Sequence, residues 1–241
     1  MSLLIDADFI LYKNAAACEI DIDYGDDVIV VQSRFSDLQR NLLRELEKIK
    51  TQLEGHSDHL ILFFSDSTNF RKEIYPDYKG HRNRKKPCGY RRAVNWLKTI
   101  YDVVTYPTLE ADDALGIIQT EEPEADHIIV SPDKDMRQIP GKLFNMEELF
   151  SVTPEEGKRW HLIQTLSGDQ TDGYAGCPGI GIKKAEALFA KHGESWQTVV
   201  DAFEKAGLDE ETALLNARLA RILQSTDYDR DSKSVRLWTP D

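Results

Sequence analysis

The chain has 241 residues, of which 41% are hydrophobic, and this composition excludes global disorder and allows one large domain or a domain with an appendage. No apolar run approaches the roughly 18 residues of a membrane span, and the start of the sequence has no signal-peptide pattern. The three cysteines suggest neither a zinc site nor a disulfide framework. We therefore expect a cytoplasmic protein without a membrane partner. The formal net charge of −12 disfavours a polyanionic partner unless positive charge is concentrated locally.

The first half of the chain alternates between segments typical of strands and segments typical of helices. We expect strands at residues 2–5, 59–64, 103–106 and 126–130, a hairpin over 19–32, and helices over 7–17, 33–53 and 93–100, with another helix starting near residue 108. Ser33 or Ser36 is the expected cap of the helix over 33–53. Strands that alternate with helices predict an α/β fold, with a mostly parallel sheet covered by helices on both faces.

Acidic residues follow the C-terminal ends of these strands. Asp6, Asp66, Asp133 and Asp135 come directly after strands, and the third strand leads to Glu110, Asp112 and Asp113 at a helix start. Because ligands collect beyond this edge of a parallel sheet, we expect these carboxylates to converge there. Like charges this close raise the pKa of at least one group, and a site that keeps all of them ionised needs a cation. A solvated acidic helix start is the alternative for residues 108–116 taken alone.

The positive charge is concentrated between the second and third strands. Residues 71–92, which we call the basic segment, hold nine Lys or Arg against two acids, a net charge of 9 − 2 = +7. Local asymmetry of this kind predicts a nucleic-acid surface within an otherwise acidic protein.

The second half of the chain is predicted to be mainly helical. After a hairpin that ends at residue 152, Thr153-Pro154-Glu155-Glu156 has the cap, proline and capping-box acid of a helix start. Further on, the glycines of Pro178-Gly179-Ile180-Gly181 would let the backbone approach a phosphate at the next helix start, beside Lys183 and Lys184. A plain connector is the alternative. We expect closing helices over 195–206 and 209–224, a tail edge strand, and two parts, 1–152 and 153–241.

The acidic residues determine the chemistry that we predict. Asp169 and Asp172 bring the carboxylates to nine, and no Cys or His accompanies them. Oxygen ligands favour Mg²⁺ or Mn²⁺ over zinc. Two ions about 4 Å apart would be accommodated, one activating water and the other stabilising a leaving oxygen. Next to a basic segment, phosphodiester hydrolysis is the natural reaction.

Several motifs together resemble those of the flap endonuclease, or structure-specific 5′ nuclease, superfamily, and most of all the phage T7-type 5′→3′ exonucleases. They are Asp6, Phe-Ser-Asp66, Phe70-Arg71, Pro76-Asp-Tyr78-Lys79-Gly-His-Arg82, Glu110-Ala-Asp112-Asp113, Asp133-Lys-Asp135 and Gly168-Asp169, followed by Asp172 and Pro178-Gly-Ile-Gly-Ile-Lys. The resemblance covers nearly the whole chain in order.

The resemblance implies a PIN-like nuclease core with a DNA-gripping helix–three-turn–helix motif at about 162–192, often with bound K⁺. By position, Asp6, Asp66, Glu110 and Asp112 resemble ligands of a first Mg²⁺ and Asp133, Asp135, Asp169 and Asp172 those of a second, with Asp113 in support and Asp133 placed to bridge both. Lys79 and Arg82 resemble cations over the scissile phosphate, and Tyr78 a residue that stacks on the terminal base. Further DNA contacts are expected at Arg71, Arg84, Lys85, Lys86, Gly179, Gly181, Lys183 and Lys184.

The implied activity is 5′→3′ exonucleolytic hydrolysis of double-stranded DNA with a free 5′ end, and of RNA–DNA hybrids, by a monomer in the host cytoplasm if a phage encodes it. A 5′ flap endonuclease is the first alternative, although the stretch between Arg82 and Arg91 is short for a threading arch. A haloacid-dehalogenase-type phosphatase would use Asp6 of Asp6-Ala-Asp8 as its nucleophile but gives Pro178–Lys184 no role. An inactive DNA-binding module would lack ligands, and none is missing.

Overall fold

The computed structural model describes residues 1–82 and 85–240 and is built on a six-stranded sheet. In spatial order its strands are β5 (Asp102–Val104), β4 (Leu60–Phe63), β1 (Leu3–Asp6), β6 (Ile128–Val130), β7 (Gly141–Phe144) and β8 (Leu149–Val152). Neighbouring strands from β5 to β7 pair in parallel, and β8 pairs antiparallel with β7. The predicted α/β fold with a mostly parallel sheet is therefore confirmed.

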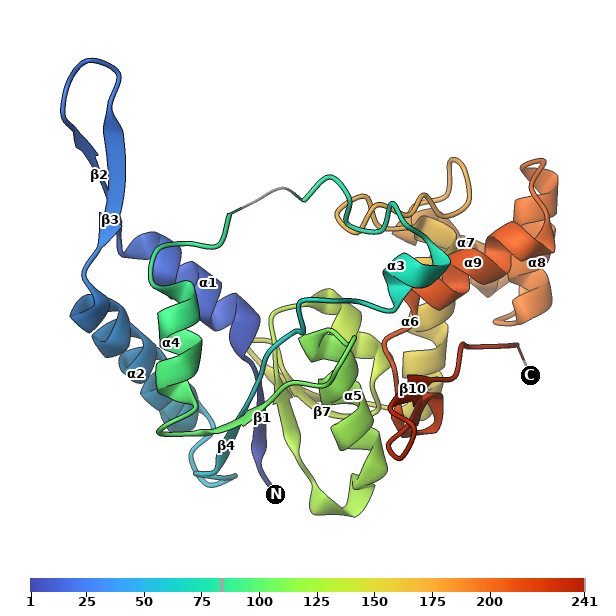
Figure 1. The fold of residues 1–241 in the computed structure, drawn as a ribbon. Coiled ribbons are helices and arrows are strands. Elements are labelled where there is room, and N and C mark those ends of the chain that lie inside the picture. The colour runs from blue at the N-terminus through green and yellow to red at the C-terminus, as the bar shows by residue number, and fades with distance from the viewer. Residues whose placement is uncertain (83–84, 241) are drawn as a thin grey trace.

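Helices cover both faces of the sheet because successive side chains of a strand point to opposite sides. Leu3 and Ile5 of β1 pack among α1 (Ala7–Ala17), α2 (Phe35–Gln52) and α4 (Tyr90–Leu97), as Figure 1 shows. Leu4 faces the opposite core, beneath α5 (Ala111–Glu121). The α2 helix is capped at Arg34 without a side-chain hydrogen bond, so the predicted serine cap is wrong.

Four further helices form a second core beside the sheet. They are α6 (Pro154–Ser167), α7 (Ile182–His192), α8 (Trp196–Lys205) and α9 (Glu210–Ala220), and Ile163, Phe189 and Phe203 are buried between them. Thr153 caps α6 and forms the predicted capping box with Glu156. The α9 helix ends at Ala220 rather than at residue 224. The division of the chain at residue 152 stays a prediction.

The shorter elements complete the chain. They are α3 (Arg71–Ile74), the 3₁₀ turns η1 (Pro123–Ala125), η2 (Lys134–Gln138) and η3 (Ser225–Asp227), and the strands β9 (Tyr228–Asp229) and β10 (Ser234–Val235). The β9 and β10 strands form a sheet of their own, so the tail does not add an edge strand to the main sheet. No helix in the described ranges combines the length and apolar character of a membrane span.

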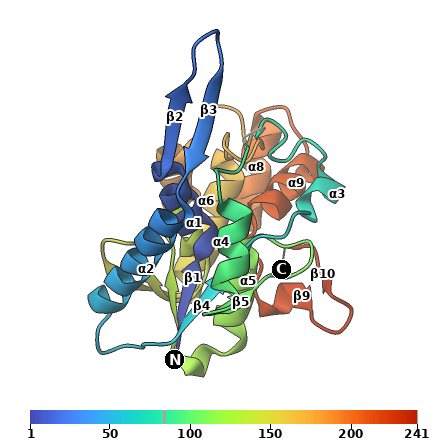
Figure 2. The same cartoon turned by 60° about the vertical axis from the view of Figure 1, so that its left-hand side comes forward.

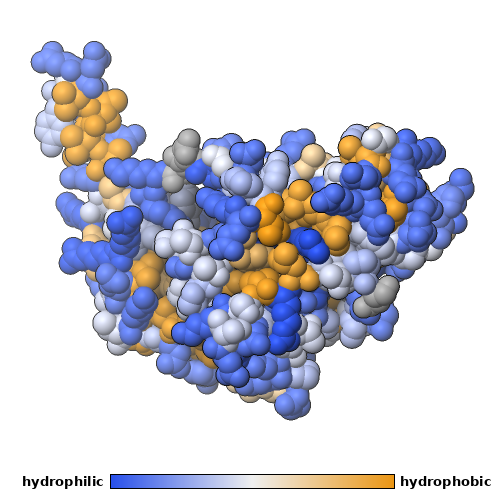
Figure 3. Space-filling view, turned by 45° about the vertical axis from the view of Figure 1, so that its right-hand side comes forward, coloured by the Kyte–Doolittle hydropathy of each residue, from blue (hydrophilic) through white to orange (hydrophobic). Residues whose placement is uncertain are grey.

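The predicted hairpin between α1 and α2 is confirmed and projects from the body of the molecule. Its strands, β2 (Glu19–Asp23) and β3 (Ile29–Ser33), extend upward from the body of the molecule in Figures 1 and 2. Apolar side chains cover much of this projection in the space-filling view (Figure 3), and Ile20, Val28 and Ile29 are among those exposed.

Candidate active site

A cavity of about 320 Å³ lies at the C-terminal edge of the sheet, where β1, β4 and β6 end. Seven carboxylates line it, those of Asp6, Asp8, Glu110, Asp112, Asp133, Asp135 and Asp172. Arg71, Lys79, Arg82 and Lys86 also contribute to its walls. The predicted convergence of acidic strand ends is therefore observed for Asp6, Asp133 and Asp135, and the start of α5 delivers Glu110 and Asp112.

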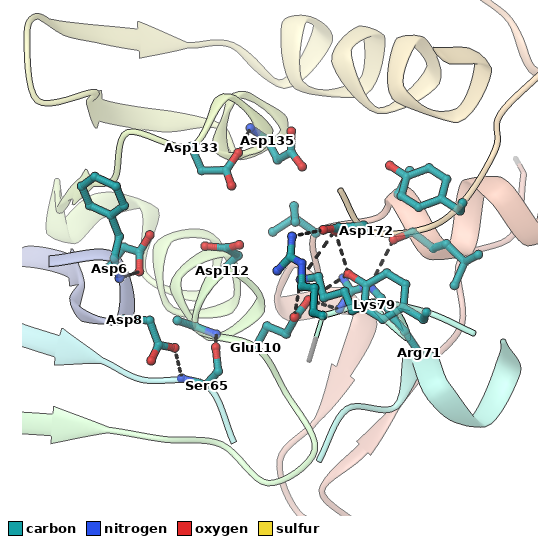
Figure 4. A pocket seen from close by; sticks show the side chains of 18 of the residues that line it. Asp6, Asp8, Ser65, Arg71, Lys79, Glu110, Asp112, Asp133, Asp135 and Asp172 are labelled. Atoms are coloured by element: carbon teal, nitrogen blue, oxygen red, sulfur yellow. Dashed lines mark hydrogen bonds and ion pairs between the residues drawn. The ribbon is translucent and has the colours of Figure 1, made fainter. Parts of the chain in front are cut away.

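One side of the cavity is dominated by negative charge, although Lys86 Nζ lies 3.8 Å from Asp8 Oδ1. Figure 4 shows Asp6 and Asp8 on this side, with Asp112 facing the space between them and the cations. Burial raises the pKa of Asp6 to about 6, and Asp8 and Asp133 add to this effect although Ser131 donates a hydrogen bond of 2.9 Å. Burial and the neighbouring acids Asp6 and Asp133 also raise the pKa of Asp112, which accepts no hydrogen bond from the described residues. A cation is the partner that these groups lack.

The opposite side pairs its carboxylates with cations of the basic segment. Lys79 Nζ lies 2.5 Å from Glu110 Oε1 and 3.5 Å from Asp172 Oδ2, and Arg82 Nη2 lies 2.8 Å from Asp172 Oδ1. Burial alone would raise the pKa of Glu110, but Lys79 and Arg71 outweigh it and hold that pKa at about 2. Glu110 is thus ionised, and Lys79 and Arg82 are held at the cavity wall.

A third cation bridges two acids near the mouth of the cavity. Lys134 Nζ lies 2.9 Å from Asp135 Oδ1 and 3.1 Å from Asp169 Oδ2. Asp169 is not among the residues lining the cavity, and its other oxygen accepts N–H groups of the α6–α7 connection, including that of Thr171 at 2.7 Å. Asp169 therefore lies at the rim.

Arg71 and Asp113 form a buried ion pair, which contradicts two predictions. Arg71 is 1% exposed and Asp113 is 0% exposed. Their contacts are bidentate, at 2.7 and 2.8 Å, and Arg71 Nε also donates to the Leu219 carbonyl at 3.1 Å. Arg71 cannot contact DNA from this position and Asp113 cannot reach a metal ion, because each side chain is enclosed by protein and bound to the other.

Tyr78 is also buried, at 1% exposed, although a stacking role was predicted for it. Its hydroxyl oxygen lies 3.0 Å from a carboxylate oxygen of Glu110 and 2.9 Å from one of Asp172, and its single proton is donated to one of them at a time. A side chain that stacks on a base must offer an open ring face. The buried ring of Tyr78 offers none, so that prediction is wrong and the residue instead orients two cavity carboxylates.

Asp66 is turned away from the cavity. Its carboxylate accepts hydrogen bonds from the Ser67 N–H at 2.7 Å, the Thr68 hydroxyl at 2.7 Å and the Thr108 N–H at 2.9 Å. These bonds, that from Thr108 first, lower its pKa. It does not line the cavity, so the structure does not bring it together with the other carboxylates, and its role as a first-metal ligand stays a prediction.

The donor chemistry of the cavity fits divalent cations such as Mg²⁺, because carboxylate oxygens are the ligands that hard cations prefer. Asp6 and Asp112, whose charged forms burial disfavours, are the residues that such an ion would stabilise most directly. Within residues 1–82 and 85–240, however, no three acidic, histidine or cysteine side chains are already grouped around one metal position.

Comparison with known proteins identifies the family of this chain. A family model, "5'-3' exonuclease, N-terminal resolvase-like domain", matches residues 1–159. The chain belongs to this 5′–3′ exonuclease family. The resemblance that the sequence motifs suggested is therefore confirmed.

Two phage enzymes are similar to this member of the family over more than nine tenths of their length. The exodeoxyribonuclease of Enterobacteria phage T3 is 29% identical over 285 aligned residues, which cover 99% of this chain and 92% of that protein. The exonuclease of Escherichia phage T7 is 28% identical over 282, covering 99% and 93%.

Solved structures share the fold. A phage T5 5′-exonuclease with bound divalent zinc has a TM-score of 0.68 at 16% identity, over 91% of this chain and 88% of that one. A phage T5 flap endonuclease in a complex with DNA and metal ions has a TM-score of 0.69 at 15% identity, over 93% and 89%. At these identities the likeness establishes the PIN-like fold alone.

Asp8 is a cavity residue of this exonuclease-family chain that the sequence reasoning did not assign. It lines the cavity beside Asp6, and its carboxylate accepts the Ser65 N–H at 2.7 Å. The pattern Asp6-Ala-Asp8 was visible in the sequence, where it suggested only a phosphatase motif. Because α1 begins at Ala7, Asp8 lies in its first helical turn, directly next to the end of β1.

The remaining predicted DNA contacts lie outside the cavity or at its edge. Lys85, Lys183 and Lys184 are exposed, and Lys184 Nζ donates to the Gly179 carbonyl at 2.7 Å. Gly179 has a φ of +73°, which favours glycine. At Gly181 a Cβ would meet nothing within 4 Å and φ is −100°, so neither packing nor conformation requires glycine there. Arg84 lies outside the described residues. The DNA contacts expected at Arg84 and at the other residues of this paragraph stay predictions.

Proposed function

We propose that this protein is a metal-dependent 5′→3′ exonuclease that hydrolyses phosphodiester bonds of duplex DNA from a free 5′ end, and also of RNA–DNA hybrids. The observation that carries the proposal is the cavity itself, in which acids from the ends of β1 and β6, from the start of α5 and from the α6–α7 connection face Lys79 and Arg82 of the basic segment. The named exonucleases of phages T3 and T7, similar over the whole chain, support the same activity.

We propose two Mg²⁺ ions, which Mn²⁺ could replace, held by carboxylates on both sides of the cavity. Asp6, Asp112 and Glu110 would hold the first ion, and Asp135, Asp169 and Asp172 the second, with Asp133 between them. Bound ions of this kind supply an activated water and stabilise the leaving oxygen. The zinc and metal-ion complexes of the phage T5 proteins are in keeping with this proposal.

The chain's own residues would orient the phosphodiester and balance its charge. Lys79 and Arg82 hold their positive charges at the cavity wall through Glu110 and Asp172, so they need little rearrangement to contact a phosphate there. Preorganised cations of this kind stabilise charge that develops on a reacting phosphate. The Tyr78 hydroxyl helps to keep the carboxylates of Glu110 and Asp172 in place.

Duplex affinity would come from two separate places. One is the exposed part of the basic segment, including Lys85 and Lys86, and the other is the start of α7 with Gly181, Lys183 and Lys184. Because no packing or conformational reason explains glycine at 181, a backbone phosphate approaching the α7 N-terminus is the reason that we propose. A bound K⁺ at this connection belongs to the same proposal.

The test is digestion of a 5′-labelled duplex with and without Mg²⁺, beside a 5′-flapped duplex and p-nitrophenyl phosphate. We expect metal-dependent release of 5′ nucleotides from the duplex and no hydrolysis of the phosphate monoester. Asp133→Asn should stop cleavage and leave duplex binding intact, because one ligand charge is lost while both DNA-contacting places remain. Near-normal turnover of this variant would reject the two-ion assignment, and predominant cleavage at the flap base would make the protein a flap endonuclease.

A further inference from the structure

Asp8 is a cavity residue whose contacts reach beyond the cavity. Its side chain is 23% exposed and lies next to Ser65, on the side of the cavity opposite Lys79 (Figure 4). None of the proposed steps at the metal site uses it. Its two oxygens instead accept hydrogen bonds from groups in two other parts of the chain.

These contacts connect three parts of the fold. Asp8 Oδ2 accepts the Ser65 N–H at 2.7 Å, at the end of β4. Asp8 Oδ1 accepts the hydroxyl of Tyr90, the first residue of α4, and lies 3.8 Å from Lys86 Nζ. Ser65 Oγ in turn accepts the Ala111 N–H at 3.0 Å, at the start of α5. Asp8 thus links the end of the basic segment to the helix that carries Glu110 and Asp112.

Residues 85–90, near the C-terminal end of the basic segment, have few other side-chain contacts besides the burial of Pro87 and the contact of Cys88 Sγ with the Val31 carbonyl at 3.6 Å. Lys86 Nζ lies 4.3 Å from the centre of the Tyr90 ring, and the Cys88 N–H donates to Glu19 at 2.7 Å. Lys86 is otherwise exposed, whereas Tyr90 is 6% exposed and its hydroxyl depends on Asp8. A buried hydroxyl that loses its partner is unfavourable by about 1–3 kcal/mol. The position of Lys86 over the cavity edge therefore depends on Asp8.

We propose that Asp8 is a positioning residue that fixes Lys86 and Tyr90, and so sets where the end of the basic segment meets the DNA backbone. The carboxylate acts through Tyr90 and Lys86, which its Oδ1 contacts, while its Oδ2 is held by the Ser65 N–H. Removing its charge would leave Lys86 in the protein but no longer hold it at the cavity edge. Misplacement of a contact by about 1 Å can lower a rate by roughly 100-fold.

The first experiment compares Asp8→Asn, Lys86→Met and the double variant, with Asp37→Asn as a control that removes an exposed acid of α2. Asp8→Asn should bind a duplex at least as tightly as the wild type, because a negative charge is lost, yet cleave it about 10–100-fold more slowly in a single turnover. Lys86→Met should slow cleavage similarly and also weaken binding. The double variant should cleave no more than about threefold more slowly than Lys86→Met, because Asp8 acts through Lys86. Losses that multiply in the double variant would overturn the proposal.

A second measurement does not depend on cleavage, since the proposal rests on the proposed function. Hydrogen exchange of the amides between residues 85 and 92 should become at least tenfold faster in Asp8→Asn and in Tyr90→Phe, while calorimetry with Mg²⁺ alone should give the wild-type affinity. A lower Mg²⁺ affinity with unchanged exchange would make Asp8 a metal ligand and overturn the proposal. If the wild type cleaved no duplex at all, the proposed function would fail, whereas the exchange data would still test the anchoring by Asp8.

Discussion

The buried pair of Arg71 and Asp113 gives a quantitative prediction about stability. Replacing Arg71 by Met leaves the Asp113 carboxylate, which is 0% exposed, without its counter-ion and leaves the Leu219 carbonyl without its donor. Breaking a buried pair by removing one partner typically lowers the free energy of unfolding by about 3–5 kcal/mol. For a chain of this size each kcal/mol shifts the melting temperature by about 2–4 °C, so we expect a decrease of about 6–20 °C.

Asp113→Asn tests the same pair from the other side. The asparagine retains an acceptor for the Leu223 N–H, which Asp113 binds at 3.1 Å, but leaves the buried guanidinium with only the more distant Glu110, at 3.4 Å, as an ionic partner. Urea and thermal unfolding of both variants should show losses of the same order. The matched control is Arg40→Met, which breaks the exposed 3.0 Å pair between Arg40 and Asp37 and should leave the melting temperature almost unchanged.

Two results would refute this reasoning. If Arg71→Met unfolded within about 1 kcal/mol of the wild type, the ion pair would not be a major source of stability. If Asp113→Asn retained wild-type stability but lost Mg²⁺ binding in calorimetry, Asp113 would be the metal ligand that the family resemblance implied.

Further predictions concern the cations of the cavity, the DNA contacts at the start of α7 and the pH dependence of stability. Lys79→Ala should lower kcat by roughly 10²–10³-fold, and an effect on KM alone would reassign Lys79 to substrate binding. Lys183→Ala with Lys184→Ala should lower the slope of log K against log salt by about two units on duplexes of roughly 20 base pairs and spare cleavage of those of roughly 6, and equal losses on both would reject the two-place model. Lys134→Met should tighten Mg²⁺ binding measured by calorimetry, because its ammonium competes for Asp135 and Asp169, and unchanged affinity would exclude competition. Burial lowers the pKa of His161 from 6.5 to about 3, so below pH 6.5 the unfolded chain binds a proton that the folded chain does not. Stability of the wild type should therefore fall as the pH decreases from 6.5 towards 3, less steeply in His161→Gln, and parallel urea-unfolding profiles would contradict this.

The sequence predicts where the chain brings acids together better than it predicts where their side chains point. Asp6, Asp133 and Asp135 reach the cavity because each follows a strand of the parallel sheet, and the strand order fixes that position. Asp66 follows a strand in the same way, yet donors at Thr68 and Thr108 hold its carboxylate in the neighbouring loop. Local hydrogen bonds of this kind depend on loop geometry, which residue spacing does not specify.

Burial at the junction of the two cores is the second feature that spacing could not predict. Arg71, Tyr78 and Asp113 carry the charge and hydrogen-bonding groups of a DNA or metal site, and they occur within motifs that resemble one. The end of α9 covers them, since Arg71 bonds the Leu219 carbonyl, which lies 148 positions further along the chain. A contact over that sequence distance leaves no periodicity or composition signal near residue 71.

The charge of the basic segment therefore differs from the excess of +7 that its residues suggest. Arg71 is neutralised by Asp113, Lys79 by Glu110, Arg82 by Asp172, and Lys86 lies beside Asp8. Each of these partners is an acid of the cavity wall or of the core behind it, so the segment and the cavity compensate one another. At Lys79, Arg82 and Lys86 we expect positive charge to become more available to a phosphate as another cation takes over these carboxylates. For this reason we expect the acidic cavity and the basic segment to act as one electrostatic unit, in which divalent cations and a polyanionic substrate would favour each other's binding.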